Sequence, residues 1–591
     1  MATHKQHLVE SIRARAATSP QATALEQGAR SITYRELDAL IDERARVLRD
    51  HGAAGALVAL ERAKSPEFVV DYLSVLAAGG VVVPLDPDVP PARRDVFVEL
   101  ARPRLLLRSS GPPETRTGDP HEAIAEDGAF VYFTSGSTGV PKPVLGSALG
   151  VRTFADWFCR EFGFGPGDRF AFIAGVSFEA SLRDLFPPLT AGATLVIPEP
   201  DDLVSPAATV DWLARTDIGV VTVVPSVARG WLRDGRRRCP KVRAVFFLGE
   251  PLTPDVQTGW LDTFSGTSVQ VNSYGSTESG QGTVYRQIAV GERFTEPVPA
   301  GRPVPGTRYC LIAPEATLSA ELVRAALRQP PAAGEIVLVS RSCSHGYLGL
   351  PTENAARFAD LGAGETAYRT GDLGRVDERG ELVVIGRADD EVKINGVRVH
   401  PVEVTRAIRA QPAVADAFVA AVGGTEPRLT AYVVPAMGQP LDVGRLRSGL
   451  LDLLPPVMIP SRFVELDELP TTRTGKVDRA RLTELAARHA PAAVFVAPTG
   501  ELERWLAEQF TELLGTPRVS AGDDLFALGG DSITATRLVS RIADDHGVQL
   551  SQRAVFAAAT VTGLAAAILA EQLLATDPEE LRALLDSLDD A

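Results

Sequence analysis

The first two-thirds of the chain alternates short apolar runs with segments of helical periodicity, and no other feature restricts the possible folds as strongly. Short apolar runs flanked by glycine or proline are typical of buried strands, and their alternation with helices is typical of layered α/β proteins. The predicted strands are 56–60, 80–85, 194–197, 219–224 and 244–248, and predicted helices include 67–78 and 207–215. We therefore expect a large α/β core.

The pattern changes after residue 386. A smaller α+β unit is expected there, with strands at 391–394 and 431–434 and a helix near 401–410. Residues 490–498 have the composition of a linker. The segment beyond it is helical, with an apolar helix face formed by Leu502, Leu506, Phe510, Leu513 and Leu514 and with further helix starts near 532 and 561.

Charge is distributed unevenly along the chain. The net charge is −15, which argues against a nucleic-acid or anionic-membrane partner. Residues 500–591 hold 16 Asp and Glu against 6 Lys and Arg, so the C-terminal part differs physically from the rest. The tail, 576–591, carries the helix-start signal Asp577–Pro578 and an apolar side. It is either a frayed, solvated helix or a docking element.

The cysteines and the apolar segments limit the class of protein. Cys159, Cys239, Cys310 and Cys343 are scattered without metal-ligand spacing, so neither a disulfide framework nor a zinc site is expected. The charged N-terminus lacks the apolar region of a signal peptide, and no apolar stretch approaches 18 residues. We expect a cytoplasmic protein.

Residues 130–142, FVYFTSGSTGVPK, form the clearest candidate for an anion-binding loop. An apolar strand runs into small residues whose backbone N–H groups can converge on phosphate, and Lys142 can supply a positive charge. The loop consists of Thr134, Ser135, Gly136, Ser137, Thr138 and Gly139. A Walker A loop is excluded, because Gly139 is not followed by Lys and Ser or Thr. Composition alone would also allow a surface loop.

The full string resembles the phosphate-binding signature of adenylate-forming enzymes, the superfamily of acyl-CoA synthetases, luciferases and nonribosomal peptide synthetase adenylation domains, although Pro143 stands where the family has glycine. Further strings resemble the family's motifs in the same order. They are SITYREL (31–37), LAAGGVVVPLD (76–86), NSYGSTE (272–278), GEIVLVSRSCSHGYL (334–348), YRTGDL (368–373), GRAD (386–389), EVKINGVR (391–398) and TGKVDR (474–479). The resemblance implies a large N-terminal subdomain, 1–386, and a small C-terminal one, 387–489.

The resemblance also assigns roles to residues. The nucleotide-binding set comprises the 134–139 loop, Lys142, Asn272 near the adenine edge, Tyr274 stacked on adenine, Thr277, Asp372 on the ribose hydroxyls and Arg387. Glu278 would help to hold Mg²⁺, and Asp389 would be the hinge. Lys476 would be the catalytic lysine, although one lysine in isolation could equally be an ordinary surface residue.

A second resemblance lies near the C-terminus. Residues 523–538, DDLFALGGDSITATRL, are similar to a thiolation (peptidyl carrier) domain, which implies an all-α four-helix carrier at 499–575. In that family 4′-phosphopantetheine is attached to the serine of GGDS, here Ser532. A serine at a helix start can also serve simply as an N-cap.

The expected substrate pocket departs from the family. Amino-acid adenylation domains bind the substrate amine with the aspartate of a Phe-Asp-x-Ser motif, but the equivalent residue here is Glu179. Arg183 lies four residues on and would pair with Glu179 if the segment is helical. The two side chains either neutralise each other, or Arg183 faces an anionic or keto group. Alignment of the motifs adds Ala180, Ser226, Phe246, Leu248, Ser273, Gln281 and Gly282 to the pocket.

These resemblances imply an enzyme that adenylates a small carboxylic acid with ATP and Mg²⁺ and loads it onto its own carrier, for nonribosomal peptide or related natural-product assembly. An amino acid is the expected substrate; a keto, hydroxy or aryl acid is the alternative, as is an inactive scaffold that presents a carrier. No HHxxxDG string of a condensation domain is present. The expected partners are a phosphopantetheinyl transferase and a separate condensation or tailoring enzyme; the need for a small helper protein is left open. The substrate and the oligomeric state are left open.

Overall fold

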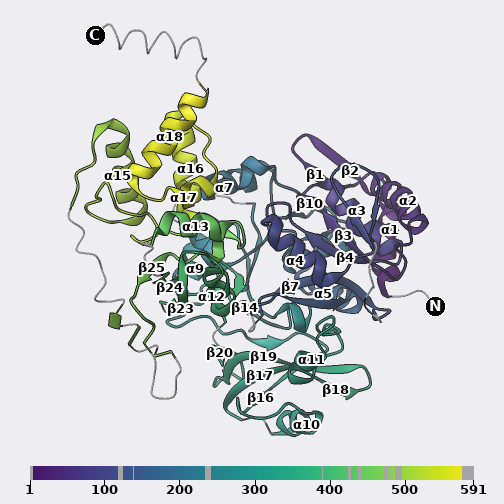
Figure 1. Ribbon diagram of the computed structural model, residues 1–591. Helices are drawn as coiled ribbons and strands as arrows, with labels where there is room; N and C mark the ends of the chain where they lie inside the picture. The colour runs from purple at the N-terminus through teal and green to yellow at the C-terminus, as the bar shows by residue number, and fades with distance from the viewer. Residues whose placement is uncertain are drawn as a thin grey trace. The chain divides into compact units, whose positions relative to one another are not determined.

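The computed structural model describes residues 4–116, 121, 124–136, 139–232, 241–329, 331–388, 391–423, 427–436, 441–470, 477–478, 481–482, 484–485 and 495–575. The chain forms two compact units, Met1–His400 and Pro401–Ala591 (Figure 1). Residues 387–400, expected in the small subdomain, group with the first unit. The physical reason is a hairpin, β21 (Val392–Ile394) and β22 (Val397–Val399), whose turn and second strand hydrogen-bond to Glu250 and Glu278 of that unit.

The largest sheet of the first unit has nine strands among the described residues. Its order is β15 (Arg302–Pro303), β14 (Val284–Ile288), β13 (Val269–Tyr274), β12 (Ala244–Leu248), β11 (Val220–Val223), β9 (Arg169–Ala171), β10 (Thr194–Val196), β1 (Thr23–Gln27) and β2 (Arg30–Thr33). The central strands pair in parallel, and antiparallel strands close both edges. The connecting segments include α1 (His4–Thr18), α2 (Tyr34–Asp50), α5 (Ala148–Phe162), α6 (Ser181–Ala191), η1 (Pro200–Leu203), α7 (Pro206–Arg215), α8 (Pro225–Leu232), α9 (Pro254–Thr263) and η2 (Thr277–Ser279).

A second sheet carries the phosphate loop. In the described part of the chain its order is β6 (Glu114–Thr115), β5 (Leu105–Leu107), β3 (Leu57–Glu61), β4 (Val81–Leu85), β7 (Gly128–Thr134) and β8 (Lys142–Ser147), with α3 (Pro66–Ala77) and α4 (Pro91–Ala101) between strands. The loop joins the antiparallel strands β7 and β8. Because Thr134 and Lys142 are paired in register, the threonine at the end of one strand lies opposite the lysine that begins the next.

The third sheet of this unit is antiparallel and carries the YRTGDL motif. It contains β16 (Thr307–Ile312), β17 (Ala333–Ser340), β18 (Phe358–Gly362), β19 (Glu365–Val376) and β20 (Leu382–Arg387), with α10 (Ala320–Arg328) and α11 (Pro351–Arg357) between them. Asp372 and Arg387 are register partners on β19 and β20. This pairing places two predicted nucleotide-binding residues side by side.

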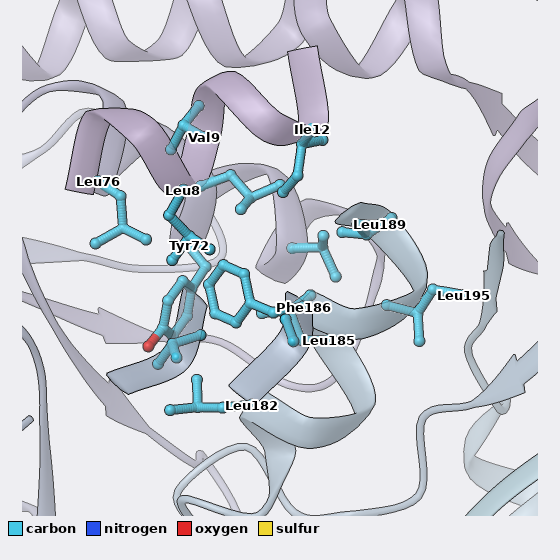
Figure 2. Packing of buried hydrophobic residues seen from close by; sticks show 14 of the residues in the cluster. Leu8, Val9, Ile12, Tyr72, Leu76, Leu182, Leu185, Phe186, Leu189 and Leu195 are labelled. Atoms are coloured by element: carbon cyan, nitrogen blue, oxygen red, sulfur yellow. The ribbon is translucent and has the colours of Figure 1, made fainter. Parts of the chain in front are cut away.

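The core of the first unit holds α6 firmly in place. Figure 2 shows apolar side chains from α1, α3, α6 and β10 packing toward one another. The residues from α6 are Leu182, Leu185, Phe186 and Leu189, each 1% exposed or less. The start of α6 therefore has little freedom to move, which matters because Glu179 and Arg183 lie there.

The second unit combines a small α+β part with a helical part. The α+β part contains α12 (Pro401–Arg409), β23 (Val414–Val422), β24 (Arg428–Pro435), α13 (Val443–Leu451), η3 (Pro456–Met458) and β25 (Arg462–Glu465). The helical part contains α15 (Gly500–Leu514), α16 (Ser532–His546), α17 (Gln552–Ala557) and α18 (Val561–Ala575). The predicted α/β core, α+β unit and four-helix segment are all present. In the part of the chain that is described, every helix is too short or too polar to cross a membrane.

Candidate active site

The phosphate loop contains a tight turn where it is described. Gly139 has φ +77° and donates its N–H to the Gly136 carbonyl at 2.9 Å, which closes a tight turn. A Cβ on Gly136 would lie 2.0 Å from the Val140 carbonyl oxygen, so only glycine fits there. The Ser135 hydroxyl is buried without a hydrogen-bond partner. The loop therefore offers an unused hydroxyl beside its backbone turn; Ser137 and Thr138 lie outside the described residues.

Glu278 lies at the point where the phosphate loop meets the NSYGSTE segment. Its Oε1 accepts hydrogen bonds from the Thr134 hydroxyl and the Tyr347 hydroxyl, each at 3.2 Å, and its Oε2 accepts one from Arg398 Nη1 at 2.8 Å. Burial alone would raise the pKa of Glu278, but the Arg398 guanidinium and the hydrogen bonds outweigh burial and leave the pKa below its ordinary value. This carboxylate is 2% exposed and ionised. Lys142 Nζ lies 5.2 Å from the centroid of the Tyr347 ring.

A second buried carboxylate belongs to the YRTGDL motif. Asp372 is 6% exposed; its Oδ2 accepts from the Tyr274 hydroxyl at 2.6 Å and its Oδ1 from Arg387 Nη1 at 2.7 Å. Burial, followed by the nearby Asp372 charge, raises the pKa of Tyr274 well above its ordinary value, so the phenol remains a donor. Asn272 donates its amide to the carbonyls of Val298 and Pro299 at 3.0 Å and so fixes that segment. Thr277 begins the short helix η2.

The predicted pocket residues divide into two groups. Glu179, Arg183, Ser273 and Gln281 form one connected cluster, in which Gln281 donates its amide to Glu179 and Arg183 Nη1 donates to the Ser273 hydroxyl at 3.2 Å. Ser226 instead donates its backbone N–H and hydroxyl to Glu250, at 2.9 and 3.1 Å.

Aromatic and small residues bound the same region. Phe246 packs on Phe158, with ring centroids 4.4 Å apart, and Leu248 ends the buried strand β12. A Cβ on Gly282 would lie 2.8 Å from the Phe154 ring, so glycine is needed for that ring to approach. Ala180 is the N-cap of α6, which places Glu179 before the helix rather than in it. The condition set for a helical pairing of Glu179 with Arg183 is therefore not met.

The GGDS segment begins helix α16 in the second unit. Ser532 is the first helical residue, and the N-cap is Asp531, whose Oδ1 accepts the Thr534 backbone N–H at 2.8 Å. The capping role considered for Ser532 thus belongs to its neighbour. A Cβ on Gly530 would lie 2.7 Å from the Leu525 carbonyl, which requires glycine there. Lys476 and Asp389, the predicted catalytic and hinge residues, lie outside the described residues, as does the tail.

Comparison with known families gives three matches, which cover successive segments of the chain. Residues 12–348 match the AMP-binding enzyme family, residues 403–476 its C-terminal domain, and residues 504–568 the phosphopantetheine attachment site. The first match alone covers more than half of the chain. The chain belongs to the AMP-binding enzyme family.

Individual relatives agree with this assignment. The chain is 34% identical over 585 residues to the probable non-canonical nonribosomal peptide synthetase CymA of Salinispora arenicola, covering 93% of this chain and 7% of CymA. It is 31% identical over 584 residues to syringomycin synthase SyrB1 of Pseudomonas syringae pv. syringae, covering 93% of this chain and 94% of SyrB1. In fold it is similar to holo-PA1221, a nonribosomal peptide synthetase protein with adenylation and peptidyl carrier domains bound to a vinylsulfonamide inhibitor. The TM-score is 0.74 at 23% identity, over 94% of this chain and 96% of PA1221. The chain thus spans a small part of CymA and nearly all of SyrB1.

This AMP-binding enzyme is an adenylation–thiolation didomain and an adenylate-forming ligase: it activates a carboxylic acid with ATP and loads it onto the phosphopantetheine of its carrier. Glu278 fits a role toward Mg²⁺, which is commonly bound by one or two carboxylates together with substrate phosphates. Among the described residues no cluster of three or more His, Cys, Asp or Glu side chains is placed to hold a metal on its own. The start of α16 is suited to a phosphate group, because the free N–H groups and the dipole of a helix N-terminus favour anions.

Three residues that shape this site were not predicted from the sequence. Tyr347 and Arg398 contact Glu278 directly, and Glu250 receives hydrogen bonds from both Ser226 and Gly396. Tyr347 and Arg398 lie within strings that resemble family motifs, so the sequence did mark them as candidate site residues. Their contact with Glu278 could not be inferred, because Glu278 is distant from both in sequence. Glu250 follows strand β12 by two residues, and the carboxyl end of a parallel strand is where such side chains gather.

Proposed function

We propose that this ligase activates an amino acid at the site around Glu278 and that a separate enzyme then collects the acyl group from the carrier. The observation that carries the proposal is the hydrogen bond between Thr134 and Glu278, residues 144 positions apart in sequence. It joins the phosphate loop to the acidic residue expected to hold Mg²⁺. Two motifs of the family thereby meet at one place.

In this proposal the loop 134–139 and Lys142 bind the β- and γ-phosphates, Asp372 binds the ribose, and Tyr274, Asn272, Thr277 and Arg387 position the nucleotide. Glu278 would hold Mg²⁺, which would supply neutralisation of phosphate charge. Lys476 is assigned the catalytic role, in which its positive charge would stabilise the negative charge that develops on the α-phosphate. A carboxylate oxygen attacks the α-phosphorus, the bond to the bridging oxygen breaks, and pyrophosphate leaves. Because this reaction creates charge on phosphate oxygens, positioning and electrostatic stabilisation supply most of the catalysis.

The substrate amine is assigned to Glu179. A carboxylate suits an ammonium group, and Gln281 already fixes the position of this half-buried one. The second candidate is a keto, hydroxy or aryl acid, which the replacement of the family's aspartate by Glu179 favours. ATP–pyrophosphate exchange with a panel of acids distinguishes amino acids from keto, hydroxy or aryl acids as substrates.

The carrier requires two kinds of partner. A phosphopantetheinyl transferase modifies Ser532, and a downstream condensation or tailoring enzyme takes the acyl group. We place both steps in the cytoplasm, where ATP is available and where the free thiols of Cys159, Cys310 and Cys343 are stable.

The test is ATP–pyrophosphate exchange together with the intact mass of the pantetheinylated protein, measured with a panel of acids. We expect Lys476→Ala to reduce exchange by about 100-fold or more, the range for loss of a group that stabilises transition-state charge. Ser532→Ala should keep exchange and lose all acyl loading. Full exchange by Lys476→Ala would contradict the role of that lysine.

Matched controls separate these roles from folding. Lys241 is exposed and lies 3.7 Å from Asp217, so Lys241→Ala should keep both activities. Ser551 is the N-cap of α17 in the carrier, so Ser551→Ala should lower stability slightly and still be loaded. Loading of Ser532→Ala would show that another residue carries the prosthetic group.

A further inference from the structure

Arg183 is a buried cation, and buried cations in proteins are rarely found without an anionic partner in contact. The residue is 6% exposed and lies in the first turn of α6, whose apolar face is held in the core (Figure 2). Its Nη1 donates to the Ser273 hydroxyl and its guanidinium lies 5.5 Å from the Phe154 ring centroid. Its Nε is buried and has no hydrogen-bond partner. A buried charge of this kind is retained when another group satisfies it.

Glu179 does not satisfy Arg183, although it is close in sequence. Within the described residues no ion pair of 4 Å or less joins them, and Glu179 is engaged by Gln281 instead. The neighbouring carboxylate, Asp184, accepts the backbone N–H groups of Ile173 and Ala174, both at 3.0 Å. We call Glu179 and Arg183 the open pair, because each charge is held by a different neutral residue.

Gln281 adds a second unused polar atom to the same cluster. It is 5% exposed and its Nε2 donates to Glu179, which fixes the orientation of the amide because a carboxylate accepts hydrogen bonds and cannot donate them. The opposite atom, Oε1, is buried without a partner. The pocket thus offers a cation and a donor at Arg183, an anion at Glu179 and an acceptor at Gln281.

We propose that Arg183 binds a second carboxylate of the substrate, so that this ligase activates an acidic amino acid whose ammonium group lies at Glu179. The proposal rests on the proposed function, since it takes amino-acid adenylation as given. One carboxylate is consumed in the adenylate, and the remaining carboxylate and ammonium match the two charges of the open pair. A neutral side chain would leave the buried guanidinium without a carboxylate in contact with it, and an amide would satisfy its hydrogen bond but not its charge.

The experiment is ATP–pyrophosphate exchange by the full chain with matched substrates: aspartate against asparagine, glutamate against glutamine, and alanine as a small neutral acid. We expect at least one acidic substrate to exceed its amide by about 100-fold in kcat/KM, because sites built around a specific polar group discriminate strongly against analogues that lack it. Arg183→Met keeps side-chain length and removes the charge. It should lose this preference, because kcat/KM for the acidic substrate falls far more than kcat/KM for its amide.

Two controls make the outcomes distinct. Arg243 also lies over a phenylalanine ring, Phe164 at 4.7 Å, but it pairs with Asp168, so Arg243→Met should keep the preference for acidic substrates. Binding of the acidic acyl-sulfamoyl adenosine by calorimetry should weaken in Arg183→Met, and thermal unfolding should show that the variant is folded. Two results would overturn this proposal and leave the proposed function intact. One is exchange with neutral amino acids at least as fast as with acidic ones. The other is an equal loss of exchange for all substrates in folded Arg183→Met. Exchange with keto, hydroxy or aryl acids but no amino acid would overturn the proposed function and this proposal together.

Discussion

Two arginine–carboxylate pairs in the first unit behave in opposite ways. Glu278 and Arg398 form a closed pair: they are in contact at 2.8 Å, and Thr134 and Tyr347 donate to the remaining carboxylate oxygen. Glu179 and Arg183 form the open pair, whose charges do not touch and whose guanidinium keeps an unused N–H. The same residue types therefore give one pair whose charges are in contact and one pair whose charges are not.

The two carboxylates show the difference in their protonation. The pKa of Glu278 is below its ordinary value, since Arg398 outweighs burial. Burial raises the pKa of Glu179 to about 6, with Arg183 opposing and Glu278 reinforcing the rise. Contact, rather than the mere presence of an arginine, decides which effect is larger. The closed pair contributes to folding, whereas the open pair leaves its unmet interactions available for a substrate.

The largest expected effect comes from breaking the closed pair. Arg398→Met should destabilise the protein by about 3–5 kcal/mol, because removing one partner leaves a buried charge without compensation. Arg183→Met removes a charge that has no ion-pair partner and should change stability by less than about 1 kcal/mol. Denaturant unfolding followed by tryptophan fluorescence measures both, since four of the five tryptophans lie in the first unit. Equal losses of unfolding free energy in the two variants would contradict the distinction between the closed pair and the open pair.

The next effect depends on pH. The folded pKa of Glu179 is about 6, above the ordinary 4.5. Between these values the folded protein keeps a proton that the unfolded chain has released, so stability falls as pH rises through this window and the cost is complete above pH ~6. Glu179→Gln removes the cost. We expect the variant to match wild type at pH 4 and to exceed it by about 1–2 kcal/mol at pH 8 without substrate. A constant difference at all pH values would contradict this origin.

Most of the fold could be predicted from the sequence. The strand predicted at 244–248 is β12 to the residue, and that at 194–197 overlaps β10, because buried parallel strands leave short apolar runs. The helix predicted at 207–215 corresponds to α7, whose start is marked by Ser205 and Pro206.

The contacts that distinguish the two pairs could not be predicted. Spacing of four residues suggested that Glu179 and Arg183 would touch, but α6 begins only at Ser181. Their actual partners, Gln281 and Ser273, are 102 and 90 positions away, and Arg398 reaches Glu278 across 120. Short-range periodicity carries no information about such contacts, which depend on how distant loops pack.

The smallest effect is expected from a third arginine–carboxylate pair that lacks burial. Arg308 Nη2 donates to both oxygens of Glu365, at 2.8 and 2.7 Å, and the two side chains are 50% and 33% exposed. Despite this forked geometry, Arg308→Met should cost less than about 1 kcal/mol, because water already solvates both charges. The cost should shrink further in high salt, where exposed charges are screened, whereas the loss in Arg398→Met should persist. A loss at Arg308 as large as that at Arg398 would mean that forked pairing, not burial, gives the closed pair its stabilising effect.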